Sequence, residues 1–437
     1  MISIDTLISA RWIIPVEPTG TVLEHHSIAV QAGRIVDLLP TTDACARYAA
    51  STHVELNQHV LLPGLINLHS HVAMTLMRGL ADDLPLMTWL KEHIWPIEAK
   101  HVAPTFVHDG AQLACAEMLR GGTTCFNDMY FFPEATAQVV DQAGMRATLG
   151  IITFEFPTAY AADADDYLRK GLETRDAYRD HTRLSFCIAP HAPYTVSDKT
   201  FEKILTFSEQ LEIPVHTHVH ETLDEIQQSL DAYHLRPVAR LHNLGLLSPR
   251  FIAAHMVHVS PDEIALCAER GVYIAHCPVS NLKLGSGIAP LTQWNAAGVT
   301  VGLGTDGAAS NNRLDLLNEM RFAALLAKGA SGDASTLPAH QALAMATLHG
   351  AQALGLDHEI GSLKIGKAAD LVAITIDAIE TTPCYDVASH LVYAAGREQV
   401  TDVWVAGKRL LHDRELTTLD IHAIRARAAH WQNTLNE

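Results

Sequence analysis

The segment PGLINLHSHVAMTLMRG, residues 63–79, ends an apolar run with two histidines, His69 and His71, that stand two positions apart. Residues two apart in a β-strand face the same side, so both imidazoles can point into one cavity. A rigid pair of imidazoles suits a transition metal such as zinc or iron(II). Two histidines near a turn with no shared ligand explain this pair equally well, so the rest of the chain has to decide.

The middle of the chain alternates short apolar runs with amphipathic stretches. The stretches TFEKILTFSEQL, SPDEIALCAERG and LDLLNEMRFAALLAKG carry their apolar residues at helical spacing. Repeated strand–helix units predict a parallel sheet covered by helices, and their number favours a (β/α)8 barrel over an open doubly wound sheet. The open sheet usually begins with a Gly-rich phosphate turn, and no GxGxxG follows the first predicted strand. The apolar runs are residues 184–189, 214–219, 251–255, 272–275 and 299–303.

Both ends of the chain are rich in β-forming sequence. SIAVQAGRIVDLLP near the N-terminus alternates and then breaks at a glycine, and GSLKIGKAADLVAITID and VTDVWVAGKRLL near the C-terminus also have glycine at their turns. Two β-rich ends that enclose a long middle predict that the termini pair into one small β domain.

The charge of the chain limits its partners. The formal net charge is -18, and the 31 lysines and arginines are scattered without a run. Binding to a nucleic-acid backbone usually requires a basic surface, which this chain does not easily make. We therefore expect no nucleic-acid partner and a small neutral or cationic ligand.

Cysteine usage and hydropathy indicate the compartment. The seven cysteines are widely spaced, odd in number and without a C-x-x-C pair, which is typical of reduced thiols in the cytosol. The first residues, MISIDTLISARWIIPVEPTG, lack the basic start and long apolar core of a signal peptide. No apolar run approaches the ~20 residues of a membrane span. The sequence predicts a cytoplasmic protein with no membrane partner.

Ionisable residues end nearly every apolar run, and in a parallel barrel function lies at the carboxyl ends of the strands. A lone histidine there is more often core or surface than ligand, but coincidence at so many strand ends is far less common. Three histidines and an aspartate would leave room for a water in a catalytic zinc site. The strand-end residues are His69, His71, His191, His216, His218, His220, His255, His276 and Asp306. His216, His218 and His220 share one parity, and only the one at the strand's end is well placed to meet a metal.

The motifs, taken together and in order, resemble the amidohydrolase superfamily and, within it, the methylthioadenosine/S-adenosylhomocysteine deaminases. The resemblance covers essentially the whole chain. It is carried by LLPGLINLHSHVAMTLMRGLADDLPLMTWLKEHIWPIEA, GGTTCFNDMY, APHAPYT, HVHET, AAHMVHV, HCPVSNLKLGSGIAP, GLGTDGAASNN and GSLKIGKAADLVAI.

The resemblance implies a distorted (β/α)8 barrel with a β-sandwich made from both termini. The sandwich would comprise residues 1–61 and residues 366–437 with a C-terminal helix, and the catalytic barrel residues 62–365. Carried over by motif, the metal ligands are His69, His71, His218 and Asp306. Two-metal members bridge their ions with a carboxylated lysine on the fourth strand, and LSFCIAPH has no lysine. We therefore expect one divalent ion per subunit, zinc first, with iron or manganese as alternatives. Oligomers are common in the family, so a homo-oligomer is compatible with it.

The resemblance also assigns the catalytic residues Glu221, His255 and Asp306. Asp306 would accept a proton from the attacking water, and His255 would orient that water or help to deprotonate it. Glu221 would protonate the purine ring nitrogen and then pass a proton to the departing ammonia, as a glutamate outside the metal shell does in zinc deaminases. The alternative for Glu221 is a carboxylate that stabilises a helix start.

For the nucleoside substrate, the resemblance assigns contacts to Trp89, Glu98, His191 and Ser310, together with Glu221. Glu98 would accept hydrogen bonds from the ribose hydroxyls, although Trp89 could also be core. Some members that accept S-adenosylhomocysteine carry arginines after the third strand, and here no base stands between Arg146 and Arg169. Without these arginines, the carboxylate of S-adenosylhomocysteine would lose strong charge-assisted hydrogen bonds. We therefore expect 5′-methylthioadenosine to be preferred over S-adenosylhomocysteine.

Three other functions compete with this interpretation. A deaminase of guanine, 8-oxoguanine or a pterin, or a triazine-type hydrolase, would share the superfamily but give no reason for the pairing of Trp89 with Glu98. A metal-free scaffold protein would not need the ligands and Glu221. A nucleic-acid deaminase must approach a polyanion, which the net charge of -18 opposes.

Overall fold

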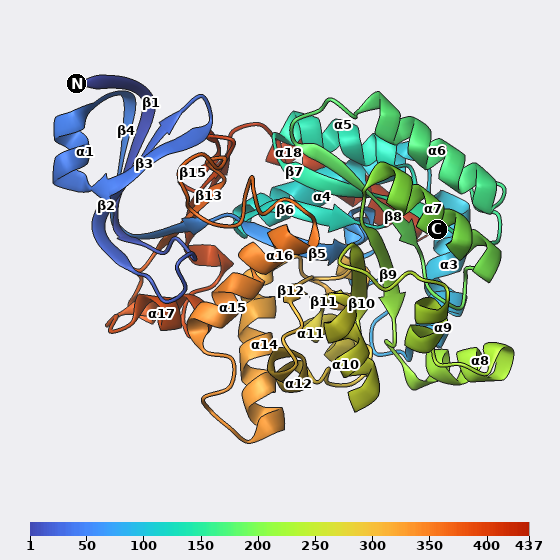
Figure 1. Ribbon diagram of the computed structural model, residues 1–437. Helices are drawn as coiled ribbons and strands as arrows, with labels where there is room; N and C mark the ends of the chain where they lie inside the picture. Colours follow the sequence, from blue (N-terminus) through green and yellow to red (C-terminus); the bar gives the residue numbers. More distant parts are fainter. Residues whose placement is uncertain (437) are drawn as a thin grey trace.

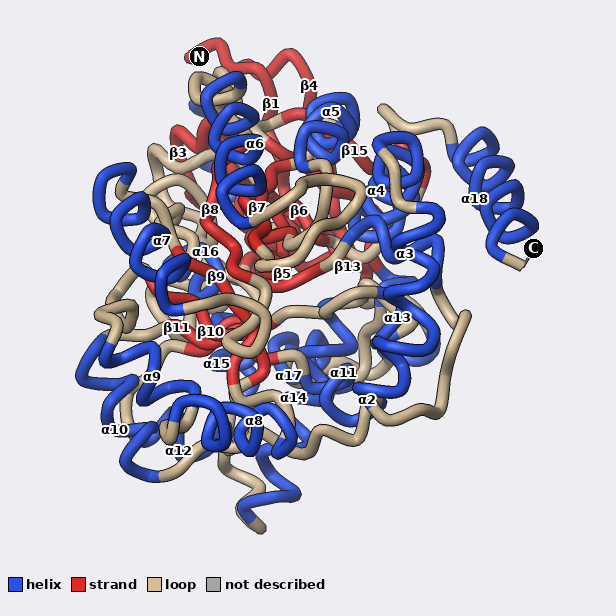
Figure 2. The backbone as a smooth tube through the Cα atoms, turned by 90° about the vertical axis from the view of Figure 1, so that its right-hand side faces the viewer, coloured by secondary structure: helices blue, strands red, loops and turns tan. Residues whose placement is uncertain are grey.

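The computed structural model describes residues 1–436, and its central element is an eight-stranded parallel sheet in the order β12-β11-β10-β9-β8-β7-β6-β5. Figures 1 and 2 show helices arranged around the outside of these strands. The strands are β5 (Leu65–Ser70), β6 (Thr123–Asp128), β7 (Arg146–Thr153), β8 (Leu184–Pro190), β9 (Val215–Val219), β10 (Phe251–His255), β11 (Tyr273–His276) and β12 (Val301–Leu303). The predicted α/β barrel is confirmed, and its third strand begins at Arg146.

The barrel closes without a regular ladder between its first and last strands. In residues 1–436, β12 and β5 are not paired; instead the backbone N–H groups of Thr305 and Asp306 donate to the carbonyl oxygen of His69, at 3.1 and 2.9 Å. The barrel is therefore irregular at this junction. It binds the turn that carries Asp306 directly to the strand that carries His69.

Helices follow most barrel strands, and several begin with a side-chain cap. Ser260 and Glu263 form a capping box at α10, and Ser197 and Thr222 cap α7 and α8, so these sequences specify where each helix starts. The helices of the barrel region are η1 (Val72–Met77), α2 (Leu86–Thr88), η2 (Trp89–Ile94), α3 (Trp95–His101), α4 (Pro104–Arg120), α5 (Pro133–Ala143), α6 (Ala164–Ala177), α7 (Asp198–Leu211), α8 (Leu223–Tyr233), α9 (Pro237–Asn243), α10 (Pro261–Arg270), α11 (Pro278–Lys283), α12 (Leu291–Ala296), α13 (Ala308–Asn311), α14 (Leu316–Ser331), α15 (Ala339–Met345) and α16 (Leu348–Ala353).

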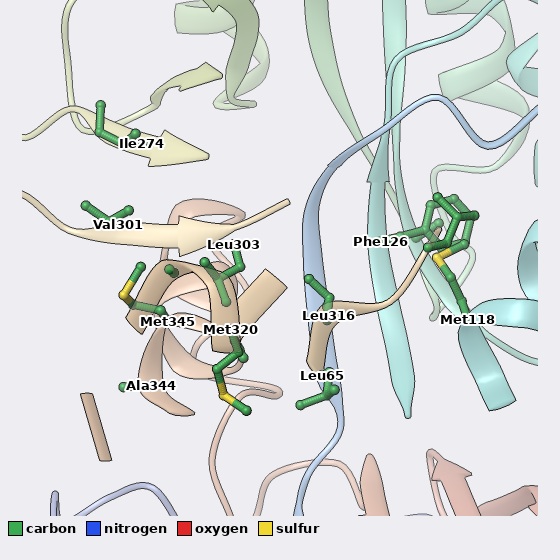
Figure 3. Close-up of a cluster of buried hydrophobic side chains, with 14 of the residues drawn as sticks. Leu65, Met118, Phe126, Ile274, Val301, Leu303, Leu316, Met320, Ala344 and Met345 are labelled. Carbon is green, nitrogen blue, oxygen red and sulfur yellow. The ribbon is translucent and has the colours of Figure 1, made fainter. Parts of the chain in front are cut away.

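The largest apolar cluster lies between the strands and the helices that cover them. Figure 3 shows Ile274, Val301 and Leu303 on β11 and β12 near Met320 of α14 and Met345 of α15, and all five are buried. Each such side chain contributes about 1.5–3 kcal/mol relative to exposure. This packing fixes the strands, and so fixes the positions of the residues at their ends.

The two termini form a second sheet, in the order β16-β15-β14-β13-β4-β1-β2-β3. Its N-terminal and C-terminal parts meet where β4 pairs antiparallel with β13, from Pro63 opposite Leu371 to His59 opposite Thr375. Figure 1 shows blue and red strands side by side at this place. Its elements are β1 (Ile2–Ile13), β2 (Leu23–Gln31), β3 (Arg34–Pro40), α1 (Thr41–Arg47), β4 (Tyr48–Pro63), β13 (Leu371–Thr375), η3 (Ile379–Thr381), α17 (Val387–Tyr393), η4 (Arg397–Gln399), β14 (Val400–Val405), β15 (Lys408–His412) and β16 (Glu415–Leu416).

Side chains from both ends share one core in this sheet. A single buried cluster contains residues of β1, β2, β3 and β4 together with residues of β13 and β14, including Ile28, Leu371 and Trp404. The predicted β domain made from both termini is therefore confirmed. The exact boundaries at residues 61 and 365 stay a prediction, and Glu437 lies outside the described residues.

The C-terminal helix, α18 (Ile421–Leu435), lies against α4 of the barrel rather than on the terminal sheet. The ring of Trp431 meets Phe106 edge-on at 5.1 Å between centroids, and its indole N–H donates to Asp109 at 2.9 Å. The helix therefore ties the end of the chain to the catalytic barrel. Among the described residues, the helices are too short or too polar to cross a membrane.

Candidate metal centre and active site

The two histidines of the first barrel strand point into the barrel. His69 lies in β5, and His71 lies one residue beyond the end of that strand. The Nδ1 of His71 donates to the carbonyl oxygen of Met129 at 2.6 Å, which leaves its Nε2 with a free lone pair. The Nδ1 of His69 lies 2.9 Å from Nε2 of His216. Carbonyl and imidazole partners of this kind orient metal-ligating histidines.

His218 and Asp306 complete a cluster with these two side chains. One ligand atom of each of the four residues lies within 4.8 Å of the others. The Oδ1 of Asp306 lies 3.3 Å from Nε2 of His69 and 3.1 Å from Nε2 of His71. The Nε2 of His218 lies 3.3 Å from Nε2 of His71, and its Nδ1 donates to the carbonyl oxygen of His191 at 2.6 Å.

This donor set fits a divalent cation. Tetrahedral zinc with bonds of about 2.0–2.1 Å places its ligand atoms about 3.3–3.4 Å apart, close to the separations in the cluster. The Nε2 of His69 is buried and has no hydrogen-bond partner of good geometry. Burial disfavours the charged form of His71, yet the neighbouring Asp306 carboxylate outweighs it and raises the pKa of His71 to about 9, so the cluster favours a positive charge. Three histidines and one carboxylate match a catalytic zinc site better than an oxygen-only magnesium site.

Glu221 and His255 lie beside the four-residue cluster. Oε2 of Glu221 is 3.9 Å from Nε2 of His255, and Nδ1 of His255 donates to the amide oxygen of Asn281 at 2.8 Å. That hydrogen bond leaves Nε2 of His255 as a proton acceptor. Burial raises the pKa of Glu221, which favours the protonated form that a general acid requires.

The backbone around Glu221 is held by a carboxylate that the sequence did not single out. Both carboxylate oxygens of Glu225 accept backbone hydrogen bonds at 2.9 Å, one from His220 and one from Glu221. Thr222, rather than Glu221, caps α8 with its side chain. The side chain of Glu221 is therefore free to face the cleft.

Two serines bind the second oxygen of Asp306. The hydroxyls of Ser280 and Ser310 both donate to Oδ2 at 2.6 Å, which leaves Oδ1 facing the histidines. Burial opposes ionisation of Asp306, but the imidazoles of His69 and His71, at 3.3 and 3.1 Å from Oδ1, outweigh it and hold the pKa well below its usual range. Ser310 was predicted to contact substrate, and it also lines the cleft. Ser280 was missed, although it lies within the quoted motif HCPVSN.

The predicted nucleoside contacts line the same cleft. Trp89 is buried at the start of η2, and Glu98 lies in α3 with one oxygen accepting a hydrogen bond from the Tyr130 hydroxyl at 2.7 Å. His191 stacks on Phe154 at 4.5 Å between ring centroids. Trp89, Glu98 and His191 therefore meet in one cleft with the four-residue cluster. Tyr130 was missed, although it stands two residues after the end of β6.

The other strand-end histidines lie outside the cleft. His216 lies beneath His69 on the inner side of β9. His220 leaves the strand with a positive φ of 55°, and its ring accepts from the backbone N–H of Val238. His276 is buried, and burial lowers its pKa to about 4. His216, His218 and His220 are two positions apart, but they do not have the same role. His220 lies beyond the end of the strand at Val219, so the alternation of a strand does not apply to it.

Glu98 is expected to be a destabilising residue at alkaline pH. Burial raises its pKa to about 7 from an ordinary 4.5, despite the hydrogen bond from Tyr130. Between these two pH values Glu98 is ionised in the unfolded chain but protonated in the folded protein. The free energy of unfolding therefore falls as pH rises, and the loss is complete above pH 7. Glu98→Gln is expected to remove this cost, by up to about 3 kcal/mol.

Melting temperatures at pH 5 and pH 8 check this expectation. The gain for Glu98→Gln over the unmodified protein should be a few degrees larger at pH 8 than at pH 5. Glu92→Gln, at an exposed position six residues earlier, is the matched control and should show no such difference. An equal gain at both pH values for Glu98→Gln would show that its carboxyl group titrates normally.

Comparison with known proteins agrees with this geometry. Residues 60–410 match the Amidohydrolase family, which is the class that the barrel and its cluster define. The crystal structure of an adenosine deaminase from Xanthomonas campestris with bound zinc has a TM-score of 0.98 at 50% identity, covering 100% of this chain and 99% of that one. A zinc complex of atrazine chlorohydrolase from Arthrobacter aurescens has a TM-score of 0.91 at 25% identity, covering 98% and 100%.

Two relatives refine the placement. Proteins named 5-methylthioadenosine/S-adenosylhomocysteine deaminase from Teredinibacter turnerae and Saccharophagus degradans are 47% and 45% identical to this chain. The first alignment covers 99% of this chain and 98% of the relative, and the second covers 98% and 96%. The chain belongs to the amidohydrolase family and, within it, to the 5-methylthioadenosine/S-adenosylhomocysteine deaminase family.

Proposed function

We propose that this protein catalyses the metal-dependent hydrolytic deamination of an adenosine-type nucleoside, and that it prefers 5′-methylthioadenosine to S-adenosylhomocysteine. The observation that carries the proposal is the position of Glu221, a buried carboxyl group beside His255 and the four-residue cluster in one cleft. The relatives named as deaminases and the adenosine deaminase structure support it. The products would be 5′-methylthioinosine and ammonia.

His69, His71, His218 and Asp306 would hold the divalent cation, and zinc is our first choice because the similar adenosine deaminase structure contains it. A divalent cation in such a site lowers the pKa of water towards ~7 and so supplies hydroxide at neutral pH. The buried serine hydroxyls on Oδ2 of Asp306 fix the orientation of that carboxylate. We infer one ion per subunit because β8 carries no lysine that could bridge a second.

Proton transfer would be divided between three side chains. Asp306 and His255 accept the proton of the attacking water, since Nε2 of His255 has a free lone pair. Glu221 would donate a proton to the ring nitrogen next to the carbon under attack. It would then receive the proton that Asp306 and His255 took from the water and pass it to the leaving amino group, and the proton of the added hydroxyl group would restore Glu221. A positioned general acid contributes roughly 10²–10⁴-fold to a rate of this kind.

Binding of the sugar would fall to the outer part of the cleft. The Tyr130 hydroxyl occupies one oxygen of Glu98 and leaves the other to accept from ribose hydroxyls. Trp89 and His191 supply flat walls for the base. A panel of free bases and nucleosides checks this assignment, since activity on guanine alone would rule out a ribose role for Glu98.

Substrate preference follows from the charge of the cleft. In both adjoining cavities, the described lining residues include no lysine or arginine, whereas Glu98, with a pKa raised to about 7, is partly ionised at neutral pH. The carboxylate of S-adenosylhomocysteine would therefore be unpaired, which costs roughly 1.5–3 kcal/mol for a lost charge-assisted hydrogen bond. The expected kcat/KM for 5′-methylthioadenosine is about 10- to 100-fold above that for S-adenosylhomocysteine. Initial rates of ammonia release measure the ratio, and a ratio below one would contradict it.

We propose that the protein acts in the cytoplasm. All seven cysteines are free thiols, and five of them are buried. A small-molecule nucleoside is its proposed partner, with no nucleic acid. A homo-oligomer is compatible with the family, and size-exclusion chromatography with light scattering measures it directly.

A further inference from the structure

A second cavity adjoins the active-site cleft. The empty space, including the part open to solvent, is about 1010 Å³ in this outer cavity and about 660 Å³ in the cleft itself. The two share Trp95, Glu98, Phe131 and Phe154 in their walls, and none of the four clustered ligand residues lines the outer one. The outer cavity is therefore a continuation of the cleft on the side away from the reacting end.

Five of the eleven residues that line the outer cavity are aromatic. Phe131 and Phe154 stack with centroids 5.7 Å apart, Phe154 and Phe156 are 4.9 Å apart, and Trp95 meets Phe156 edge-on at 6.4 Å. Phe156 is 40% exposed although it is a large apolar side chain. Exposed apolar surface gathered in a cavity marks a binding site for an apolar group.

The orientation of the nucleoside follows from the proposed deaminase function, on which this inference rests. The amino group under attack must lie beside Glu221, at the inner end of the cleft. Glu98 stands where the cleft and the outer cavity meet, so a ribose bound by it directs its 5′ carbon outward. The group on that carbon then enters the aromatic cavity.

We propose that the outer cavity is a subsite for apolar 5′-thioether groups larger than methylthio, such as alkylthio and arylthio groups. A methylthio group has a single carbon beyond the sulfur and leaves most of the outer cavity empty. An alkyl chain or a phenyl ring reaches Phe131, Phe154 and Phe156 and removes their surface from water. Each fully buried methylene is worth about fourfold in binding.

Steady-state kinetics with a series of 5′-substituted adenosines test the subsite. Adenosine, 5′-methylthioadenosine, 5′-butylthioadenosine and 5′-benzylthioadenosine are compared by kcat/KM. The butyl and benzyl derivatives are expected to equal or exceed the methyl derivative, by up to about fourfold for each buried methylene. Values lower than that of the methyl derivative would overturn the proposal.

A cavity-filling variant locates the effect. Ala99 is an exposed residue of α3 in the wall of the outer cavity, and its neighbour Lys100 is exposed and does not line it. Ala99→Trp is expected to lower the ratio of kcat/KM for the benzyl derivative to that for adenosine by roughly tenfold or more, because overpacking is costly. Lys100→Trp is the matched control and should leave the ratio unchanged.

The outcomes separate this inference from the proposed function. Turnover of adenosine and 5′-methylthioadenosine with an unchanged benzyl ratio in Ala99→Trp would overturn the subsite alone. Absence of turnover with every nucleoside would overturn the deaminase function, and the subsite with it.

Discussion

Replacement of Glu221 by glutamine is expected to lower kcat for deamination by roughly 10²–10⁴-fold, with a much smaller change in KM. Glutamine keeps the size of the side chain and can still accept a hydrogen bond from Ser286, whose hydroxyl lies 3.5 Å from Oε1. It has no carboxyl proton to give to the purine ring. Burial raises the pKa of Glu221, so the unmodified side chain carries that proton more readily than a solvated glutamate does.

Asp224→Asn is the matched control for this substitution. Asp224 is exposed in the first turn of α8, three residues from Glu221, and its neutralisation changes the net charge equally. Its kcat should stay within about twofold of the unmodified enzyme. Metal content is also measured in both variants. It should equal that of the unmodified enzyme, because Glu221 is not a member of the four-residue cluster. A Glu221→Gln enzyme with full metal content and nearly full kcat would remove Glu221 from the mechanism.

Replacement of His71 by alanine is expected to empty the metal site. The Nε2 of His71 lies 3.1 Å from Asp306 and 3.3 Å from His218, so its loss removes one of the four ligand positions. Three ligands bind a catalytic zinc only with the right geometry, and this cluster would keep two imidazoles and a carboxylate. The metal bound per subunit after dialysis should fall from near one to below about one-tenth, as measured by elemental analysis.

His358→Ala is the control for nonspecific histidine effects. His358 is exposed and lies outside the cleft. The variant should retain the full metal content and activity. Retention of one tightly bound ion by His71→Ala would mean that the cluster is not the principal metal site.

The strand ends were the most predictable part of the site. Short apolar runs that stop at histidine or aspartate mark the carboxyl ends of parallel strands, and barrel closure brings those ends together. The run at residues 251–255 coincides with β10, and the run at 214–219 differs from β9 by one residue. His69 and His71 alone remained ambiguous, because a pair of imidazoles needs distant partners to become a site.

Contacts between distant segments could not be read from the sequence. Tyr130 reaches Glu98, and Ser280 reaches Asp306, only through the folded backbone. The turn at Asp306 has a positive φ of 62°, which aims its carboxylate at the histidines. The outer cavity combines α3 with a loop that follows β7, and apolar residues there have no pattern that distinguishes a subsite from a core.

The pairing of β4 with β13 also sets the order in which the protein can be completed on the ribosome. The strands β1 to β4 are made first, but the edge of β4 that accepts β13 finds its partner only after the whole barrel has been translated. At about 5–20 residues per second this interval is on the order of tens of seconds. An apolar strand edge left open for so long is a point of misassociation between nascent chains. In the finished protein β13 covers this edge, at residues 59–63 of β4.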